Sequence, residues 1–107
     1  INPSLQDIKL SKTLGSKCVE IHTGKISNQI KQKKNYSREL NKIQKCAVYA
    51  KNIGLEVHAG HGMDYKTTKI LNKIKQIEEF NIGHFIIGEA VSHSISKVVK
   101  QFIKILR

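Results

Sequence analysis

One repeated unit limits the possible folds more than any other feature of the chain. A segment with helical spacing ends at a glycine, and a short run rich in β-branched residues follows and ends near another glycine. This alternation is typical of an α/β protein with a parallel sheet. The expected strands are residues 18–22, 55–59 and 80–82. The expected helices are residues 5–14, 37–53, 64–77 and a C-terminal segment through residue 103, whereas residues 24–35 are expected to form a polar loop.

The expected strands alternate between apolar and ionisable residues. In the first strand Val19 and Ile21 share one face, and Glu20 and His22 share the other. The other strands repeat the pattern, with Leu55, Val57 and Ala59 opposite Glu56 and His58, and with Asn81 between Phe80 and Ile82. Strands covered by helices on both faces should instead be almost continuously apolar. The pattern therefore favours a closed barrel whose interior holds the polar face.

The chain is too short for a complete eight-stranded barrel, which typically needs about 250 residues. We therefore expect a single partial domain over residues 1–107, the C-terminal portion of a (β/α)8 barrel from the end of strand 5 through helix 8. Residues 1–4 read as the tail of a strand that runs into a helix. Glycines at 24, 60, 62, 83 and 88 follow expected strands, where such barrels place their chemistry.

The charge balance is strongly basic, because 19 Lys and Arg residues face only 8 Asp and Glu residues, for a net charge of +11. A basic nucleic-acid-binding module is one interpretation. However, the lysines are spread along the chain, and Arg38 and Arg107 are the only arginines. A solvated surface and a phosphorylated small substrate are therefore favoured. The absence of a long apolar run or leader, with Cys18 and Cys46 at no zinc or redox spacing, predicts a cytoplasmic protein with reduced thiols.

Two motifs contain candidates for acid–base chemistry. His61 lies between two glycines in residues 59–62, and a histidine titrates near neutral pH, although a turn with an incidental histidine is the alternative. Glu20 needs a hydrogen bond or a charge partner to stay ionised in a barrel interior, and a purely structural acid is the alternative. A metal held by Glu20, His22, His58 and His61 is disfavoured, because nothing in the sequence holds the imidazoles of His58 and His61 on one ion.

A third motif, residues 81–84, favours a phosphate site. An expected strand ends at Gly83 and a helix is expected to begin at His84, so free backbone amides at the helix start can bind an anion. Barrels often hold phosphate after strands 7 and 8. A simple glycine turn between strand and helix is the alternative.

Read together, residues 19–24, 59–62, 81–84 and 86–88 resemble motifs of the pyridoxine 5'-phosphate synthase family. The resemblance covers nearly the whole chain, and it departs from the family at His58, Glu89 and Ile26, where asparagine, arginine and tyrosine are usual. It implies condensation of 3-amino-2-oxopropyl phosphate with 1-deoxy-D-xylulose 5-phosphate, which yields pyridoxine 5'-phosphate, phosphate and water. Another phosphate-binding barrel enzyme is the alternative within the same fold.

The resemblance also implies specific roles. His61 corresponds to the family's proton donor and Glu20 to its transition-state-stabilising carboxylate, while Gly62, Gly83 and His84 correspond to substrate contacts. No metal or organic cofactor is implied, and neither nucleic acid nor a membrane is an expected partner. The family implies a homo-oligomer, commonly an octamer. The chain alone should be inactive, because the family's catalytic base histidine and glutamate lie on earlier strands.

Overall fold

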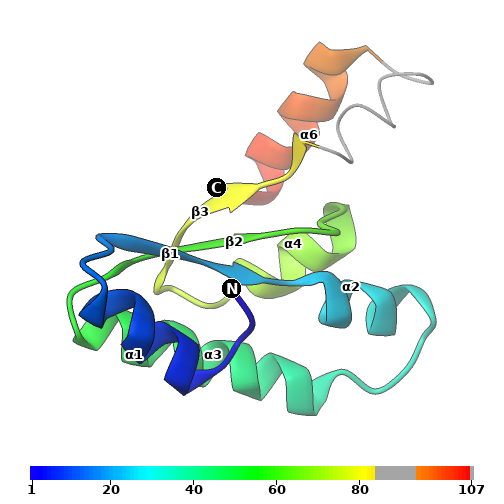
Figure 1. Ribbon diagram of the computed structural model, residues 1–107. Coiled ribbons are helices and arrows are strands. Elements are labelled where there is room, and N and C mark those ends of the chain that lie inside the picture. The colour runs from blue at the N-terminus through cyan, green and yellow to red at the C-terminus, as the bar shows by residue number, and fades with distance from the viewer. Residues whose placement is uncertain (84–93, 107) are drawn as a thin grey trace.

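The computed structural model describes residues 1–83 and 94–106 (Figure 1). Within them, helices and strands alternate along the chain. The strands are β1 (Cys18–His22), β2 (Glu56–Gly60) and β3 (Ile77–Asn81). The helices are α1 (Leu5–Thr13), α2 (Gly24–Lys31), α3 (Ser37–Asn52), α4 (Tyr65–Leu71) and α6 (Ile95–Leu106).

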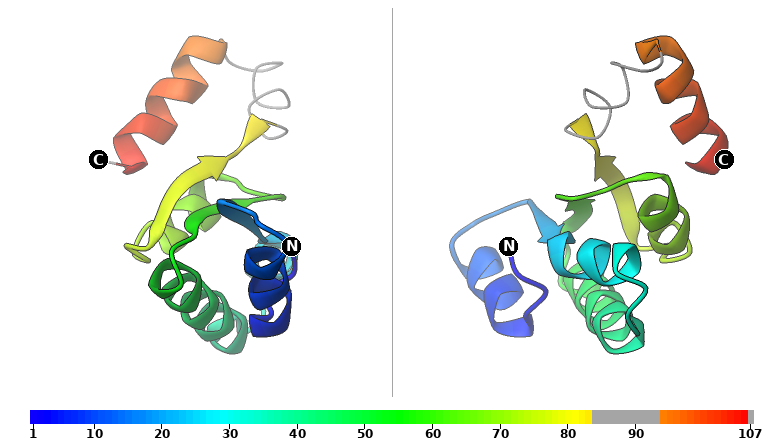
Figure 2. Two further views of the ribbon diagram at one scale, coloured as in Figure 1. Left: turned by 60° about the vertical axis from the view of Figure 1, so that its left-hand side comes forward. Right: turned by 90° about the vertical axis from the view of Figure 1, so that its right-hand side faces the viewer.

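The strands form one parallel sheet in the order β1-β2-β3. Val19 pairs with Val57, and Val57 pairs with Ile77, so the three strands are aligned in the same direction. Helices α1 and α3 lie side by side against one face of this sheet (Figures 1 and 2). The prediction of an α/β fold with a parallel sheet is therefore confirmed.

The hydrophobic core lies between the sheet and these helices. Val19, Ile21, Val57 and Ala59 are buried on this face of the sheet. The helices contribute Ile8, Ile43, Ala47 and Ala50, each fully buried. On the opposite face Glu20, His22 and Glu56 are exposed, and His58 is half-buried. The predicted separation of apolar and ionisable faces is thus confirmed for β1 and β2.

Local sequence signals set several helix boundaries. The Ser4 hydroxyl accepts a hydrogen bond from the Asp7 amide at 3.5 Å, and Asp64 Oδ1 accepts one from the Thr67 amide at 2.8 Å. These caps satisfy amides that have no partner within their own helices. Gly15 and Gly54 follow α1 and α3 with φ of +90° and +88°, a backbone conformation that glycine adopts without a steric penalty.

Three predicted segments were wrong. The expected polar loop at 24–35 contains α2, because Ile26 and Ile30 give this mostly polar segment one buried edge. The third helix ends at Leu71 rather than at 77, because Ile77 instead pairs with Val57 and begins β3. The third strand is therefore residues 77–81 rather than 80–82. The sequence of β3 does not alternate between apolar and polar residues, because Glu78 and Glu79 are adjacent and both exposed.

No helix in residues 1–83 and 94–106 is long and apolar enough to cross a membrane. Cys18 is exposed and Cys46 is buried, and neither forms a disulfide. Burial raises the pKa of the Cys46 thiol, so this side chain behaves as a small apolar core residue. The predicted start of the last helix at His84, together with Gly88 and Glu89, lies outside the described residues, whereas the predicted helical segment through residue 103 is confirmed by α6.

Candidate active site

The carboxyl ends of the three strands bring together residues that are far apart in the sequence. His22 is the last residue of β1 and pairs with Gly60, the last residue of β2. Gly60 in turn pairs with Asn81, the last residue of β3. His61 follows β2 directly. The histidine and glycine motifs predicted from the sequence therefore meet at one edge of the sheet, as the parallel arrangement requires.

Glu20 has the hydrogen-bond partner that the sequence analysis expected it to need. Asn81 Nδ2 donates a hydrogen bond of 2.5 Å to Glu20 Oε1, across the intervening strand β2. Gly60 leaves room for this contact, because a Cβ there would lie 2.9 Å from Glu20 Cδ and 3.2 Å from Asn81 Cβ. Sequence reasoning did not identify Asn81 as the partner of Glu20, although both had been placed on the polar face of their strands.

His61 adopts an unusual backbone conformation. Its φ is +85°, which costs a residue with a side chain about 1–2 kcal/mol, and the next residue, Gly62, has φ +71°. The resulting turn directs the His61 ring toward the end of β1. There it stacks on His22, with 4.0 Å between ring centroids and 26° between ring planes. This contact between His22 and His61 was not predicted.

Buried hydrogen bonds hold the turn in place. The Thr23 hydroxyl lies 2.8 Å from the carbonyl oxygens of both Gly60 and His61, and its single proton can be donated to either. The Thr23 amide also donates a 2.8 Å hydrogen bond to the Gly60 carbonyl. The Ser27 hydroxyl donates to the Thr23 carbonyl at 2.8 Å. The start of α2 is therefore linked directly to the histidine turn.

The environment of His22 disfavours its charged form. Partial desolvation lowers the pKa of this side chain, and the nearby His61 lowers it further. Glu20 opposes these effects. These effects favour the neutral form of His22, which can lie against a protonated neighbour without placing two positive charges side by side.

The remaining predicted site residues differ in how they are placed. Gly62 lies in the turn, where a Cβ would come 3.2 Å from the Ser27 Cβ. Gly83 follows β3, has no positive φ, and a Cβ there would meet no atom of the described residues within 4 Å. The packing of residues 1–83 and 94–106 therefore does not require glycine at Gly83. His84 lies outside the described residues.

His58 is not part of this group. It was expected near a strand end, but it lies in the middle of β2, where Nδ1 is 3.0 Å from a Glu79 oxygen and Nε2 is 3.5 Å from a Glu56 oxygen. Side-chain contacts therefore hold it within the sheet and away from His61. In the described part of the chain, no group of three or more His, Cys, Asp and Glu residues could hold a metal ion.

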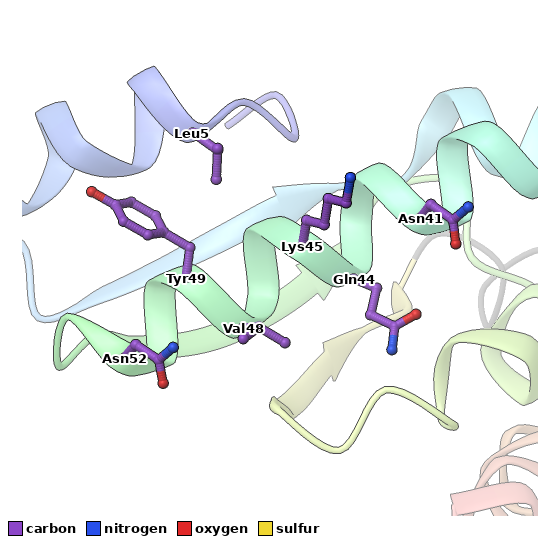
Figure 3. A pocket seen from close by; sticks show the side chains of 7 residues that line it. All are labelled: Leu5, Asn41, Gln44, Lys45, Val48, Tyr49 and Asn52. Atoms are coloured by element: carbon purple, nitrogen blue, oxygen red, sulfur yellow. The ribbon is translucent and has the colours of Figure 1, made fainter.

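A separate groove of about 530 Å³ lies on the helical side, mainly along α3 (Figure 3). It is lined by Leu5, Asn41, Gln44, Lys45, Val48, Tyr49 and Asn52. None of these residues contributes to the strand-end cluster. None of the lining residues is a histidine or a carboxylate, whereas the strand ends bring His61 close to Glu20, so the strand ends remain the candidate active site.

The fold and site together define an α/β protein with acid–base side chains at the carboxyl ends of parallel strands, where enzymes of this architecture act. The family model described as "Pyridoxal phosphate biosynthesis protein PdxJ" matches residues 1–107, and the chain belongs to this family.

Several relatives carry the name pyridoxine 5'-phosphate synthase. The protein of Pelagibacter ubique is 59% identical over 102 residues, which are 95% of this chain and 43% of the relative. That of Sulfurihydrogenibium sp. is 43% identical over 106 residues, 99% of this chain and 43% of the relative. That of Chloroherpeton thalassium is 40% identical over the whole chain and 45% of the relative. The chain thus spans less than half the length of these relatives.

Proposed function

We propose that the chain is the C-terminal part of a pyridoxine 5'-phosphate synthase, which joins 3-amino-2-oxopropyl phosphate to 1-deoxy-D-xylulose 5-phosphate. The products are pyridoxine 5'-phosphate, inorganic phosphate and water. The observation that carries the proposal is the family match over residues 1–107, with Glu20 on the polar face of β1 and His61 directly after the neighbouring strand β2. As a fragment, the chain lacks activity by itself.

The proposed fold is the C-terminal portion of a (β/α)8 barrel, with residues 1–107 forming one partial domain. Three parallel strands with an exposed polar face support this assignment, since a barrel places that face in its interior. A contact at the edge of β1 supports it further. The Ile1 amino group donates to the Glu20 carbonyl at 2.6 Å, and the His22 amide donates to the Ile1 carbonyl at 2.7 Å. A neighbouring parallel strand would make the same pair of bonds.

His61 is the proposed proton donor. The substrate amine is itself a nucleophile, so the enzyme's task is to move protons and to hold two phosphorylated molecules together. An oxygen that leaves as water must first be protonated, and an imidazolium ring can supply that proton near neutral pH. The exposed position of His61 in a glycine-flanked turn supports this role.

Glu20 is the proposed stabilising carboxylate. Positive charge develops on nitrogen when an amine adds to a carbonyl group, and a fixed carboxylate nearby lowers the energy of that state. The hydrogen bond from Asn81 supports the role, because it holds one oxygen of Glu20 in a defined position. The second oxygen is left to face the substrate.

Gly62, Gly83 and His84 are the proposed contacts to amino-oxopropyl phosphate. Gly62 ends the turn after β2, and Gly83 follows the neighbouring strand β3, so their amides can approach the same phosphate. The open space around Gly83 supports the proposal, since a phosphate needs room beside the backbone. The excess of lysines favours the binding of two substrates that each carry one phosphate group. We further propose a cytoplasmic homo-oligomer that uses neither metal nor organic cofactor.

Product formation by the full-length protein tests the proposed function. Incubation with both substrates should yield pyridoxine 5'-phosphate and inorganic phosphate in equal amounts, measured by chromatography and a phosphate assay. Reactions that lack either substrate are the controls. A full-length, folded protein that forms no pyridoxine 5'-phosphate, while the Pelagibacter ubique relative does so in the same assay, would contradict the proposal.

A further inference from the structure

The strongest unassigned feature of the site is the contact between His22 and His61. The two rings stack with 4.0 Å between their centroids, although they belong to segments that lie 39 residues apart in the sequence. Neither family resemblance nor strand position assigns a role to His22.

The surrounding backbone keeps both rings in this position. A Cβ at Gly24 would lie 2.8 Å from His61 Cδ2 and 3.3 Å from His22 Cε1, so the pair occupies space that any other residue would take. The Thr23 hydroxyl contacts the His61 carbonyl at 2.8 Å. His61 also has a φ of +85°, which fixes the direction in which its side chain leaves the chain.

A side chain in a solvent-facing turn would otherwise sample several rotamers. His61 is exposed and has no side-chain hydrogen bond among the contacts that the structure describes, so the ring of His22 is what limits its rotation. The titratable side chains that bear on His22 are His61 and Glu20. Since His22 is disposed to remain neutral, it supports a protonated His61 without charge repulsion.

We propose that His22 is a positioning residue for His61, and that its ring orients the proton-donating imidazole by stacking against it. The inference rests on the proposed function, in which His61 donates a proton to the substrate. His22 does not itself transfer the proton. It reduces the number of orientations that His61 adopts before the reaction, which is a recognised contribution to rate.

Two substitutions in the full-length protein separate stacking from other roles. His22→Ala removes the ring, whereas His22→Phe keeps a flat ring and removes its nitrogens. We expect His22→Ala to lower kcat about 10-fold with little change in KM, since displacement of a catalytic group can cost up to about 100-fold. His22→Phe should stay within about 3-fold of the wild-type kcat. His58→Asn, on the same face of the sheet but away from His61, is the control and should leave kcat unchanged.

The contact itself is measured by NMR without turnover. The stacked ring should shift the His61 Cε1–H resonance, and this shift should disappear in His22→Ala, remain in His22→Phe and be unaffected in His58→Asn. If His22→Ala fails to fold, His22→Asn replaces it. A wild-type kcat in the ring-free variant, equal losses in both variants, or an unchanged resonance in His22→Ala would overturn the proposal. If the wild-type protein makes no product, the proposed function fails, but the NMR result still decides whether the rings stack.

Discussion

At the scale of single residues, Thr23 shows how a buried side chain supports the exposed histidine turn. Thr23→Val keeps the shape of the side chain but removes the proton that is donated to the Gly60 or His61 carbonyl. We expect a loss of about 1–3 kcal/mol in the free energy of unfolding, the usual cost of a buried polar group left without a partner. Urea denaturation of the full-length protein measures it.

The matched control is Thr13→Val. The Thr13 hydroxyl is exposed and bonds only to the Lys9 carbonyl of its own helix. Its loss should change stability by less than about 0.5 kcal/mol, as for most surface substitutions. Equal effects of the two substitutions would show that Thr23 does not brace the turn.

Gly60 is the residue that lets Glu20 and Asn81 meet. In Gly60→Ala the new methyl group would lie 2.9 Å from Glu20 Cδ, so the carboxylate has to move. We expect a loss of about 1–3 kcal/mol in stability, typical of overpacking, together with a lower kcat. Gly83→Ala is the control for stability, because its methyl group would meet no atom of the described residues within 4 Å. Unfolding curves that coincide for Gly60→Ala and the wild type would contradict this account.

At the scale of helices and strands, α6 packs through few residues. Val98 and Phe102 are its buried side chains, and the ring of Phe102 lies 4.7 Å from that of Tyr65 in α4. Phe102→Ala should cost about 3–5 kcal/mol, because it leaves a cavity between the two helices. The exposed Lys100→Ala in the same helix is the control. A melting temperature that falls equally in both variants would show that α6 does not dock through Phe102.

How well each element could be predicted depends on how local its signal is. Strand β1 was predicted with its observed bounds and β2 within one residue, because one apolar face and one polar face give a clear alternation. Helix α1 was likewise defined by its cap at Ser4 and the stop at Gly15, and α3 by its apolar spacing and the stop at Gly54. In contrast, Ile74 and Ile77 continue the spacing of α4, and only the pairing of Ile77 with Val57 ends the helix. Such long-range pairing leaves no local signal.

The candidate site follows the same rule. His61, Gly62 and Glu20 could be found because their motifs lie at predictable strand ends. The hydrogen bond between Glu20 and Asn81 and the stack of His22 on His61 could not, since each depends on how neighbouring strands are aligned. The alternation of side chains along a strand shows which face of the sheet each one lies on. Which residue it contacts on the next strand depends on how the two strands are aligned.

At the scale of the whole molecule, several apolar side chains of the described residues are exposed. The large ones are Ile1, Leu5, Leu10, Leu14, Ile95, Val99, Ile103 and Leu106. The outer strands of the sheet are also partly unpaired. Expressed alone, the 107-residue chain should self-associate in sedimentation experiments. A stable monomer with a sharp melting transition would count against the partial-barrel proposal.

The measurement that bears most directly on the central claim is the effect of His61→Asn on the full-length enzyme. A proton donor acts mainly in the transition state, so kcat should fall by about 100-fold or more while KM for both substrates changes little. Asparagine adopts positive φ more readily than most residues, which preserves the turn at 61. A kcat near the wild-type value with a raised KM would make His61 a binding residue and would contradict the proposed mechanism.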